Sequence, residues 1–235
     1  GALPGMTPSA REAIYLSMAE TMATLHRVDW AAAGLADYGR QGGYFTRQIA
    51  RWTKQWEGSR TRPNADIEAL RDWLPRHLPD EAETTLCHGD FRLGNLLFHP
   101  TEPRVVAVLD WELSTLGHPL ADVAFNGMAW HTLPAEYGGI RGLDLGALGI
   151  PSEHRYLRHY LQAAGRRDGP TAFHYAFALF RMAVIFEGIA ARAAAGNAVA
   201  DNAAEVGGLA AAFARRAMAF VRGEDSAERF EENFR

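Results

Sequence analysis

The stretch from Leu86 to Glu112 limits what this chain can fold into more than any other, because it sets polar side chains in loops between short apolar runs. Its first loop contains His88, Gly89 and Asp90, and Asn95 follows five positions after the aspartate. A compact bend within one loop can bring the Asp90 and Asn95 side chains together. We therefore expect both side chains to point into the same small region.

The apolar runs on either side of a turn predict a β-hairpin. Residues 96–98 and 105–109 are apolar and partly β-branched, which is typical of short buried strands. The turn between them runs from Pro100 to Pro103. Antiparallel pairing returns the chain so that Asp110 emerges beside Asn95, where one metal ion can contact both side chains.

This arrangement matches the needs of phosphoryl transfer. A carboxylate must orient the attacking hydroxyl, and Mg²⁺, which prefers oxygen ligands, must offset the polyphosphate charge. Asp90 supplies the carboxylate, and Asn95 and Asp110 supply oxygen ligands. Glu112 adds an acid two positions later. The sequence therefore predicts a phosphoryl-transfer site.

The motif resembles a known family. Protein kinases carry H-R-D, an asparagine five residues after the aspartate, a strand pair and D-F-G. Here H-G-D at 88–90, Asn95 and D-W-E at 110–112 follow the same order. Together with HPLAD at 118–122, this pattern resembles the aminoglycoside phosphotransferase and choline kinase group. More narrowly, it resembles the phosphotransferase-like domains fused to acyl-CoA dehydrogenases, and the resemblance covers nearly the whole chain.

The resemblance implies a role for each polar residue. Asp90 would be the catalytic base, with ATP or another nucleoside triphosphate as the phosphoryl donor. Asn95 and Asp110 would bind Mg²⁺, and Glu112 would hold a second metal ion or a water molecule. Arg92 stands where protein kinases usually have a lysine, so it would touch the transferring phosphate.

Three neighbouring residues are expected to support the site. His88 is more plausible as a packed residue that orients the loop than as a base, because the acid handles the proton in this motif. Asp122 matches a buried acid that braces the loop through backbone hydrogen bonds, although helix capping explains it equally well. Cys87 precedes His88, but adjacent residues in a strand point to opposite faces, so we interpret it as a buried small residue.

The remaining sequence predicts helices. Apolar residues recur at helical spacing, with Thr7 and Ser152 as N-caps and Gly165 as a helix end. The expected helices cover 7–27, about 45–56, 64–78, 122–130, 152–165, 170–195 and about 201–222, with a glycine-rich loop at 138–149 and a charged tail at 224–235. The predicted fold is α+β and predominantly α-helical: a protein-kinase-like C-terminal lobe with a small β-hairpin at the catalytic site.

We expect residues 1–235 to form this single lobe, without the N-terminal β lobe of such enzymes. No strand-rich segment precedes the first helix, and the only lysine, Lys54, lies in a predicted helix and not in a strand that grips phosphates. The abrupt start at Gly1 favours a fragment whose missing lobe is encoded upstream. The alternatives are a non-catalytic kinase-like binding module and a metal-dependent phosphohydrolase.

The composition argues against other classes of protein. A net charge of −4 and an isoelectric point near 6.1 give no electrostatic footprint for nucleic acid. The most apolar span, residues 171–195, contains charged side chains and is too polar to cross a bilayer. A single cysteine allows no internal disulfide, which suits the cytoplasm. We expect a cytoplasmic protein that binds neither nucleic acid nor membranes.

The partner is expected to be a small hydroxylated acceptor. Arg181 and Arg192 lie on roughly one stripe of the long helix with Glu187 adjacent, so they can bind substrate or pair internally. Between residues 123 and 200 acids are sparse and arginines plentiful, which favours a neutral or anionic acceptor over a polycationic one. The resemblance suggests a hydroxyacyl compound.

Overall fold

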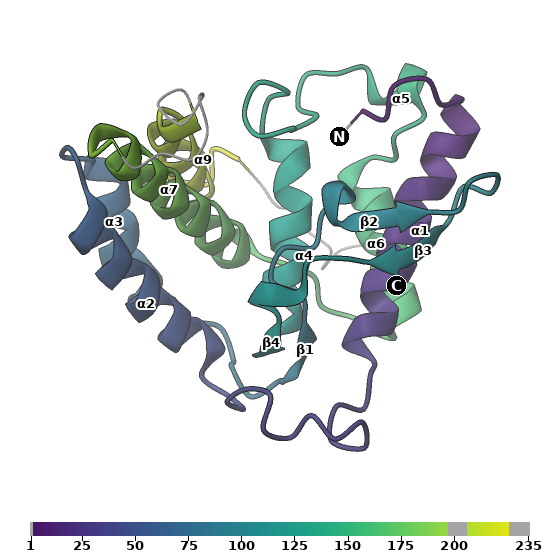
Figure 1. Cartoon of the computed structure of the whole chain (residues 1–235), viewed down its shortest axis with the longest axis horizontal. Coiled ribbons are helices and arrows are strands. Elements are labelled where there is room, and N and C mark those ends of the chain that lie inside the picture. Colours follow the sequence, from purple (N-terminus) through teal and green to yellow (C-terminus); the bar gives the residue numbers. More distant parts are fainter. Residues whose placement is uncertain (1, 197–205, 226–235) are drawn as a thin grey trace. The chain divides into compact units, whose positions relative to one another are not determined.

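The computed structural model describes residues 2–196 and 206–225, and the described chain is mostly helical (Figure 1). Contacts between residues group it into two compact units. Residues 2–42 and 83–170 form the first unit, and the described parts of 43–82 and 171–225 form the second. The predicted predominance of helix is confirmed, and the part of the chain before α1 that is described contains no strand.

Three helices build the frame of the first unit. They are α1 (Pro8–His26), α4 (Pro119–Gly127) and α6 (Glu153–Ala164). The predicted caps are confirmed: Thr7 and Ser152 each accept a hydrogen bond from a first-turn backbone N–H, and Gly165 ends α6 with a φ of 69°. Large side chains on the inner faces form one core, whose members include Tyr15, Met18, Met22, Phe91, Leu96, Val123, Trp130, Tyr156 and Tyr160.

Two short antiparallel strand pairs carry the loops of interest. β2 (Leu96–Phe98) pairs with β3 (Val105–Val108), which confirms the predicted hairpin. β1 (Thr85–Cys87) pairs with β4 (Thr115–Gly117), a second strand pair that was not predicted from the sequence. Figure 1 shows the two pairs on either side of the connecting loops.

Two predictions in the first unit, one of a helix and one of a loop, were inaccurate. α4 begins at Pro119 and not at Asp122, because His118 caps the helix and proline occupies its first turn. The helix also ends earlier than expected, and a 3₁₀ turn η4 (Met128–His131) follows it. The glycine-rich run at 138–149 is not entirely loop, since Asp144 caps a short helix α5 (Leu145–Leu148).

The second unit contains helices alone in its described part. α7 (Ala172–Ala194) packs against α2 (Tyr44–Ser59) and α9 (Leu209–Val221), and α3 (Ala65–Trp73) packs against α7 and α9. The predicted helix 64–78 is shorter than expected, because its last turns become the 3₁₀ helix η1 (Leu74–Arg76).

Two other predictions fall partly outside the described residues. The start of the expected last helix, 201–205, and residues 226–235 of the expected charged tail are not described. Within the described residues, no helix combines the length and the apolarity needed to span a bilayer.

Candidate active site

Two loops lie together because the strand pairs hold both of their ends. The 88–95 loop connects β1 to β2, and the 109–114 loop connects β3 to β4. β1 pairs with β4 and β2 pairs with β3, so each pair clamps one end of both loops. The Leu109 N–H also donates to the Asn95 carbonyl at 2.8 Å. At the other end, a side-chain Cβ on Gly89 would stand only 2.5 Å from the Leu113 carbonyl oxygen.

Asn95 orients the carboxylate of Asp90. Its Nδ2 donates to Asp90 Oδ2 at 2.7 Å and to the Asp90 carbonyl at 2.9 Å. The opposite amide orientation would place Oδ1 against two acceptors, so the hydrogen bonds fix which atom faces Asp90. Asn95 is buried, whereas the Asp90 side chain keeps 18% of its surface accessible. The carboxylate is therefore both held and reachable.

Arg92 places a positive charge next to the same carboxylate. Its Nε donates to Asp90 Oδ2 at 3.3 Å, and its guanidinium carbon lies 5.6 Å from the centre of the Tyr137 ring. The side chain is 42% exposed, and such a pair contributes only about 0–1 kcal/mol to stability. Arg92 therefore matters less for stability than for the positive charge that it places near any group approaching Asp90.

His88 is enclosed and has a partner at each ring nitrogen. Its Nε2 donates to the Leu109 carbonyl at 2.8 Å, and its Nδ1 accepts from the Asp90 N–H at 3.2 Å. The ring also contacts Phe91 and Trp111 edge-on. Because one nitrogen donates and the other accepts, the neutral imidazole satisfies both contacts, and the residue connects the two loops.

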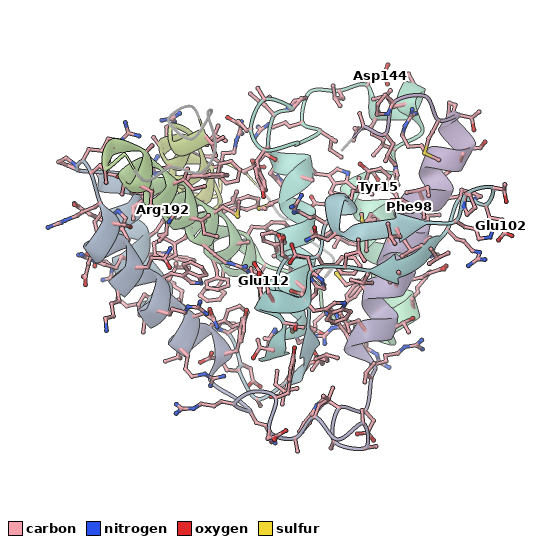
Figure 2. The ribbon with its side chains drawn as sticks, viewed as in Figure 1. Tyr15, Phe98, Glu102, Glu112, Asp144 and Arg192 are labelled. Atoms are coloured by element: carbon pink, nitrogen blue, oxygen red, sulfur yellow. The ribbon has the colours of Figure 1, made fainter. Side chains whose placement is uncertain are left out.

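Asp110 and Glu112 are exposed on the 109–114 loop, and Figure 2 labels Glu112. Asp110 adopts a left-handed conformation with φ 64° and ψ 61°, which aspartate tolerates better than most residues. Glu112 lies in the 3₁₀ turn η3 (Trp111–Leu113). The hairpin register pairs Leu96 with Val108, so Asp110 leaves β3 opposite the end of the 88–95 loop.

Three oxygen-bearing side chains on these loops are of the chemical type that binds a divalent cation. No hydrogen bond from a residue that the structure describes reaches Asn95 Oδ1 or the carboxylates of Asp110 and Glu112. Amide and carboxylate oxygens are the ligands that Mg²⁺ prefers. The donor set therefore suits the predicted metal ion.

Asp122 braces the 88–95 loop through hydrogen bonds to its backbone. Its Oδ2 accepts from the His88 N–H at 2.6 Å and its Oδ1 from the Gly89 N–H at 2.8 Å. Burial by itself raises the pKa of Asp122, but hydrogen bonds from His26 and from these two amides outweigh it and hold the pKa below 3.8. Asp122 thus lies in the first turn of α4 and also braces the loop, while capping belongs to His118.

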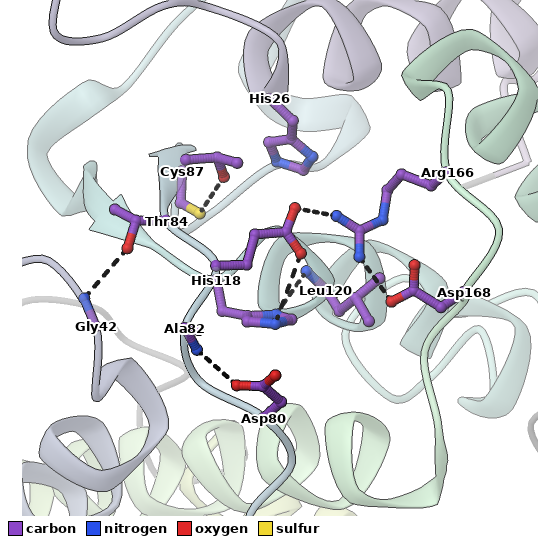
Figure 3. A network of polar contacts seen from close by, with 12 residues as sticks. His26, Gly42, Asp80, Ala82, Thr84, Cys87, His118, Leu120, Arg166 and Asp168 are labelled. Carbon is purple, nitrogen blue, oxygen red and sulfur yellow. Dashed lines mark hydrogen bonds and ion pairs between the residues drawn. The ribbon is translucent and has the colours of Figure 1, made fainter.

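Further polar contacts anchor the segments that lead into the site. Arg166 donates to Glu83 just before β1 and to Asp168 at 2.8 Å, and His118 Nε2 lies 3.9 Å from Glu83 (Figure 3). Thr84 Oγ1 accepts from the Gly42 N–H at 3.1 Å. These contacts fix the entry to β1 and the N-terminus of α4.

Several residues that support the site were not predicted from the sequence. Asn126 on α4 donates from Nδ2 to the Phe91 carbonyl at 3.1 Å and so fixes the residue after Asp90. Tyr137 contacts Arg92 through its ring, and Trp111 packs on His88. The only hint was one asparagine within the apolar run that forms α4.

The predicted acceptor residues lie in the second unit. Glu187 is 1% exposed, and its Oε1 accepts from the Thr61 N–H at 2.7 Å and from the Thr61 hydroxyl at 2.6 Å. The guanidinium carbon of buried Arg181 lies 5.5 Å from the centre of the Trp52 ring. Arg192 is exposed (Figure 2). Their assignment to the acceptor stays a prediction.

Cys87 is fully buried, as predicted. Burial raises the pKa of its thiol, and the nearby Asp122 carboxylate raises it further. Such a thiol stays protonated and is a poor nucleophile.

Comparison with known proteins agrees with this geometry. The family model described as the phosphotransferase enzyme family matches residues 2–171. Acyl-CoA dehydrogenase family member 10 of Mus musculus is 43% identical over 226 residues, 94% of this chain and 21% of its own length. The probable acyl-CoA dehydrogenase IBR3 of Arabidopsis thaliana is 41% identical over 228 residues, 89% of this chain and 27% of its own. The chain thus spans about a quarter of these relatives.

Solved structures show the same fold. A Ralstonia eutropha JMP134 protein assigned provisionally to the aminoglycoside phosphotransferases superposes with a TM-score of 0.92 at 46% identity, over 97% of this chain and 69% of that one. Macrolide 2′-phosphotransferase type I superposes with a TM-score of 0.56 at 22% identity, over 84% of this chain and 58% of that one, which supports the fold alone. The chain therefore belongs to the phosphotransferase enzyme family.

Proposed function

We propose that this chain carries the catalytic site of a small-molecule kinase, which transfers the γ-phosphoryl group of ATP or another nucleoside triphosphate to a hydroxyl group. One observation carries the proposal: Asn95 Nδ2 holds the Asp90 carboxylate at 2.7 Å while Asn95 Oδ1 and Asp110 remain available to a metal ion. A base and two metal ligands in adjoining loops are what this reaction needs.

Asp90 would act as the base. The acceptor hydroxyl would donate its hydrogen to the accessible Asp90 carboxylate as the oxygen attacks the phosphorus, and the bond to the leaving diphosphate breaks in line. Asn95 holds the carboxylate in one orientation through its two hydrogen bonds. Such positioning lowers the barrier because the reactants need not search for their geometry.

The charge of the transferring group would be offset from two directions. Asn95, Asp110 and Glu112 would hold Mg²⁺, which when bound neutralises polyphosphate charge. Arg92 supplies a cation at the Asp90 carboxylate, within reach of the transferred phosphoryl group. Asp122 and His88 hold the loop that carries Asp90.

A nucleotide-gripping lobe would pack against the β2–β3 hairpin. Leu97 and Val106 are each 48% exposed, and Leu109 is 41% exposed. Large exposed apolar side chains on neighbouring strands are typical of interaction surfaces. We propose that a β lobe from another segment of the natural protein covers them. The relatives are long enough to contain one, since this chain matches 21–27% of their length in the first two cases.

The acceptor would bind beside an accessible charged side chain. Glu187 is committed to Thr61 and Arg181 is buried against Trp52, so Arg192 is the predicted acceptor residue with the most accessible charge. Its charge favours a neutral or anionic acceptor. A cytoplasmic location remains a proposal, because the lone thiol at Cys87 is its main support.

The phosphohydrolase alternative is disfavoured because the two histidines near this site in the sequence have other hydrogen-bonding partners. A two-metal hydrolase usually shows several histidine and aspartate ligands. His99 Nδ1 instead accepts from the backbone N–H of Glu102 at 3.2 Å, and His118 caps α4.

The test uses the natural full-length protein with MgATP and a panel of hydroxylated acceptors, with ADP release as the signal. Asp90→Asn should lower kcat by about 10²- to 10⁴-fold and leave MgATP affinity nearly unchanged, because a general base contributes a factor of this size. Asp110→Asn should weaken MgATP binding in calorimetry. Asp37→Asn, at an exposed acid of the first unit, is the matched control.

Two outcomes would overturn the proposal. Turnover unchanged in Asp90→Asn would remove Asp90 from the mechanism. Phosphate release from monoesters without nucleotide would indicate a hydrolase, and a folded full-length protein that neither binds MgATP nor turns over would indicate a binding module.

A further inference from the structure

The segment that follows α1 is attached to the β1–β4 strand pair. Residues 28–42, which we call the strap, lead from α1 toward α2 and belong to the first unit (Figure 1). Backbone hydrogen bonds close its first part, from the Ala33 N–H to the Asp29 carbonyl at 2.9 Å and from the Leu35 N–H to the Trp30 carbonyl at 2.8 Å. The strap therefore has a defined conformation, although it is neither a helix nor a strand.

Both ends of the strap are attached to the residue before β1. Near its start, Trp30 Nε1 donates to the Thr84 carbonyl at 3.2 Å. At its end, the Gly42 N–H donates to Thr84 Oγ1 at 3.1 Å (Figure 3). Because Thr84 directly precedes β1, one residue of the strand pair holds the strap at two points.

The middle of the strap lies against β4. A Cβ on Gly39 would stand 2.7 Å from Thr115 Oγ1 and 2.8 Å from the Leu116 nitrogen. Cβ atoms in proteins essentially never approach another heavy atom more closely than 3.0 Å, so only glycine allows this separation. The preceding side chain, Tyr38, reaches Ser114, the residue before β4.

Ser114 links Tyr38 to the loop of the candidate metal ligands. Its N–H donates to the Trp111 carbonyl at 3.0 Å, and its hydroxyl donates to the same carbonyl. Because this bond uses the hydroxyl hydrogen of Ser114, the Tyr38 hydroxyl must donate to Ser114 Oγ. These bonds connect the strap to Trp111, which lies between Asp110 and Glu112 in the sequence.

The conformation of Asp110 requires a loop that is held on both sides. Its φ of 64° and ψ of 61° lie in the sparsely populated left-handed region. A residue keeps such a conformation where the surrounding contacts fix it. The bond from Leu109 to Asn95 holds the loop before Asp110, and Ser114 closes it after Glu112. The strap acts on the second of these two sides.

We propose that Tyr38 is a positioning residue for the candidate metal ligands Asp110 and Glu112. Tyr38 fixes the Ser114 hydroxyl, Ser114 closes the turn that contains Glu112, and this turn directly follows Asp110. The Tyr38 side chain belongs to a residue that is 43% exposed, so replacement by phenylalanine removes the attachment with little loss of packing. The role in metal binding rests on the proposed kinase function, whereas the role in fixing the loop does not.

The first test measures the loop in the natural full-length protein by hydrogen exchange and mass spectrometry. Tyr38→Phe should accelerate exchange in the 109–114 loop by about 3- to 10-fold, the factor expected for the loss of one hydrogen bond. Tyr156→Phe is the matched control, because the buried Tyr156 hydroxyl makes no hydrogen bond with any described residue. The control should leave this loop unchanged. Unchanged exchange in Tyr38→Phe, or faster exchange at slow amides throughout the chain, would overturn the positioning role.

A second variant displaces the strap and leaves the Tyr38 side chain intact. Gly39→Ala forces the strap away from β4, so exchange in the 109–114 loop should accelerate at least as much as in Tyr38→Phe. Gly58→Ala is its control, since nothing lies within 4 Å of the Cβ position there. Equal exchange in the loop of both glycine variants would show that the strap does not hold the loop.

The third test measures how ADP release in the full-length protein depends on Mg²⁺. Tyr38→Phe should raise the Mg²⁺ concentration for half-maximal turnover by about 3- to 10-fold, because residues that orient metal ligands tune the affinity for the metal. Saturating Mg²⁺ should restore kcat, whereas an enzyme that is only less stable would lose kcat at every Mg²⁺ concentration.

Two outcomes separate this role from the proposed function. An unchanged Mg²⁺ requirement in an active variant whose loop exchanges faster would overturn the role of Tyr38 in metal binding. An inactive wild type would refute the proposed kinase function, and the exchange result would still decide whether Tyr38 fixes the loop.

Discussion

Replacing Gly89 by alanine should separate the two loops of the site. Gly89 has a φ of 82°, and an added Cβ would stand 2.5 Å from the Leu113 carbonyl oxygen. Real Cβ contacts essentially never fall below 3.0 Å, so one loop must move by at least about 0.5 Å. Because Gly89 precedes Asp90 and Leu113 follows Asp110, this movement pulls the base away from the metal ligands.

The expected cost has two parts. A left-handed alanine costs about 1–2 kcal/mol. The forced contact adds about 1–3 kcal/mol, which is typical of overpacking. Gly142 isolates the first part, since it has the same φ of 82° and nothing within 4 Å of its Cβ position. Gly142→Ala should therefore lose only the conformational part, and Gly89→Ala should lose both.

Urea denaturation measures the free energy of unfolding of both variants, and ADP release measures kcat in the full-length protein. Gly89→Ala should be the less stable variant by about 1–3 kcal/mol. It should also lose about 10- to 100-fold in kcat, following the cost of misplacing reacting groups. If the two variants unfold alike and turn over alike, the loops do not meet at Gly89, and the reasoning fails.

Two further predictions concern the buried layer beneath the loops. The pKa of Asp122 is lowered in the folded chain, so its ionised form should stabilise the fold above the unfolded pKa of about 3.9 and lose this contribution as the pH falls through the folded value. The difference in unfolding free energy between wild type and Asp122→Asn should thus shrink below about pH 4, and a constant difference would contradict the assignment. Burial raises the pKa of the Cys87 thiol, so a thiol reagent at pH 8 should modify the folded chain at least about 100-fold more slowly than the urea-unfolded chain. Rapid reaction of the folded chain would place Cys87 at an accessible surface.

Local signals predicted most of the fold. Thr7 and Ser152 mark helix starts because their hydroxyl groups bond to backbone N–H groups within the next turn. Gly165 marks a helix end because it adopts a positive φ easily. The β2–β3 hairpin also depends on neighbours in sequence, since a short turn joins its strands. Such contacts are visible in a single stretch of residues.

The second strand pair shows where local signals stop. β1 and β4 have three residues each, too few for an alternating pattern to stand out. Their pairing depends on the two loops between them folding back, which no single segment encodes. α4 begins three residues earlier than predicted because His118 caps it, and histidine is not among the residues that usually mark a helix start.

The candidate site also contains some contacts that sequence spacing predicts and others that it does not. Asp90 and Asn95 share one loop, and Asp110 follows the adjoining hairpin, so their proximity could be predicted from spacing. The contact between His26 and Asp122 spans 96 positions, and that between Asn126 and Phe91 spans 35. A histidine at the end of an amphipathic helix gives no sign that it will meet a distant carboxylate.

Reacting residues have a predictable spacing and supporting residues do not, and the reason is chemical. Phosphoryl transfer fixes which atoms must meet, so the spacing between a base and its metal ligands on adjoining loops is restricted, and a motif can record it. Holding the peptide groups of His88 and Gly89 requires only a buried acceptor with its own donors, and many helix positions can supply these. The supporting residues therefore carry no fixed spacing. Their role becomes visible only when burial and hydrogen bonds are known, which is why His26 emerged from the structure and Asp90 from the sequence.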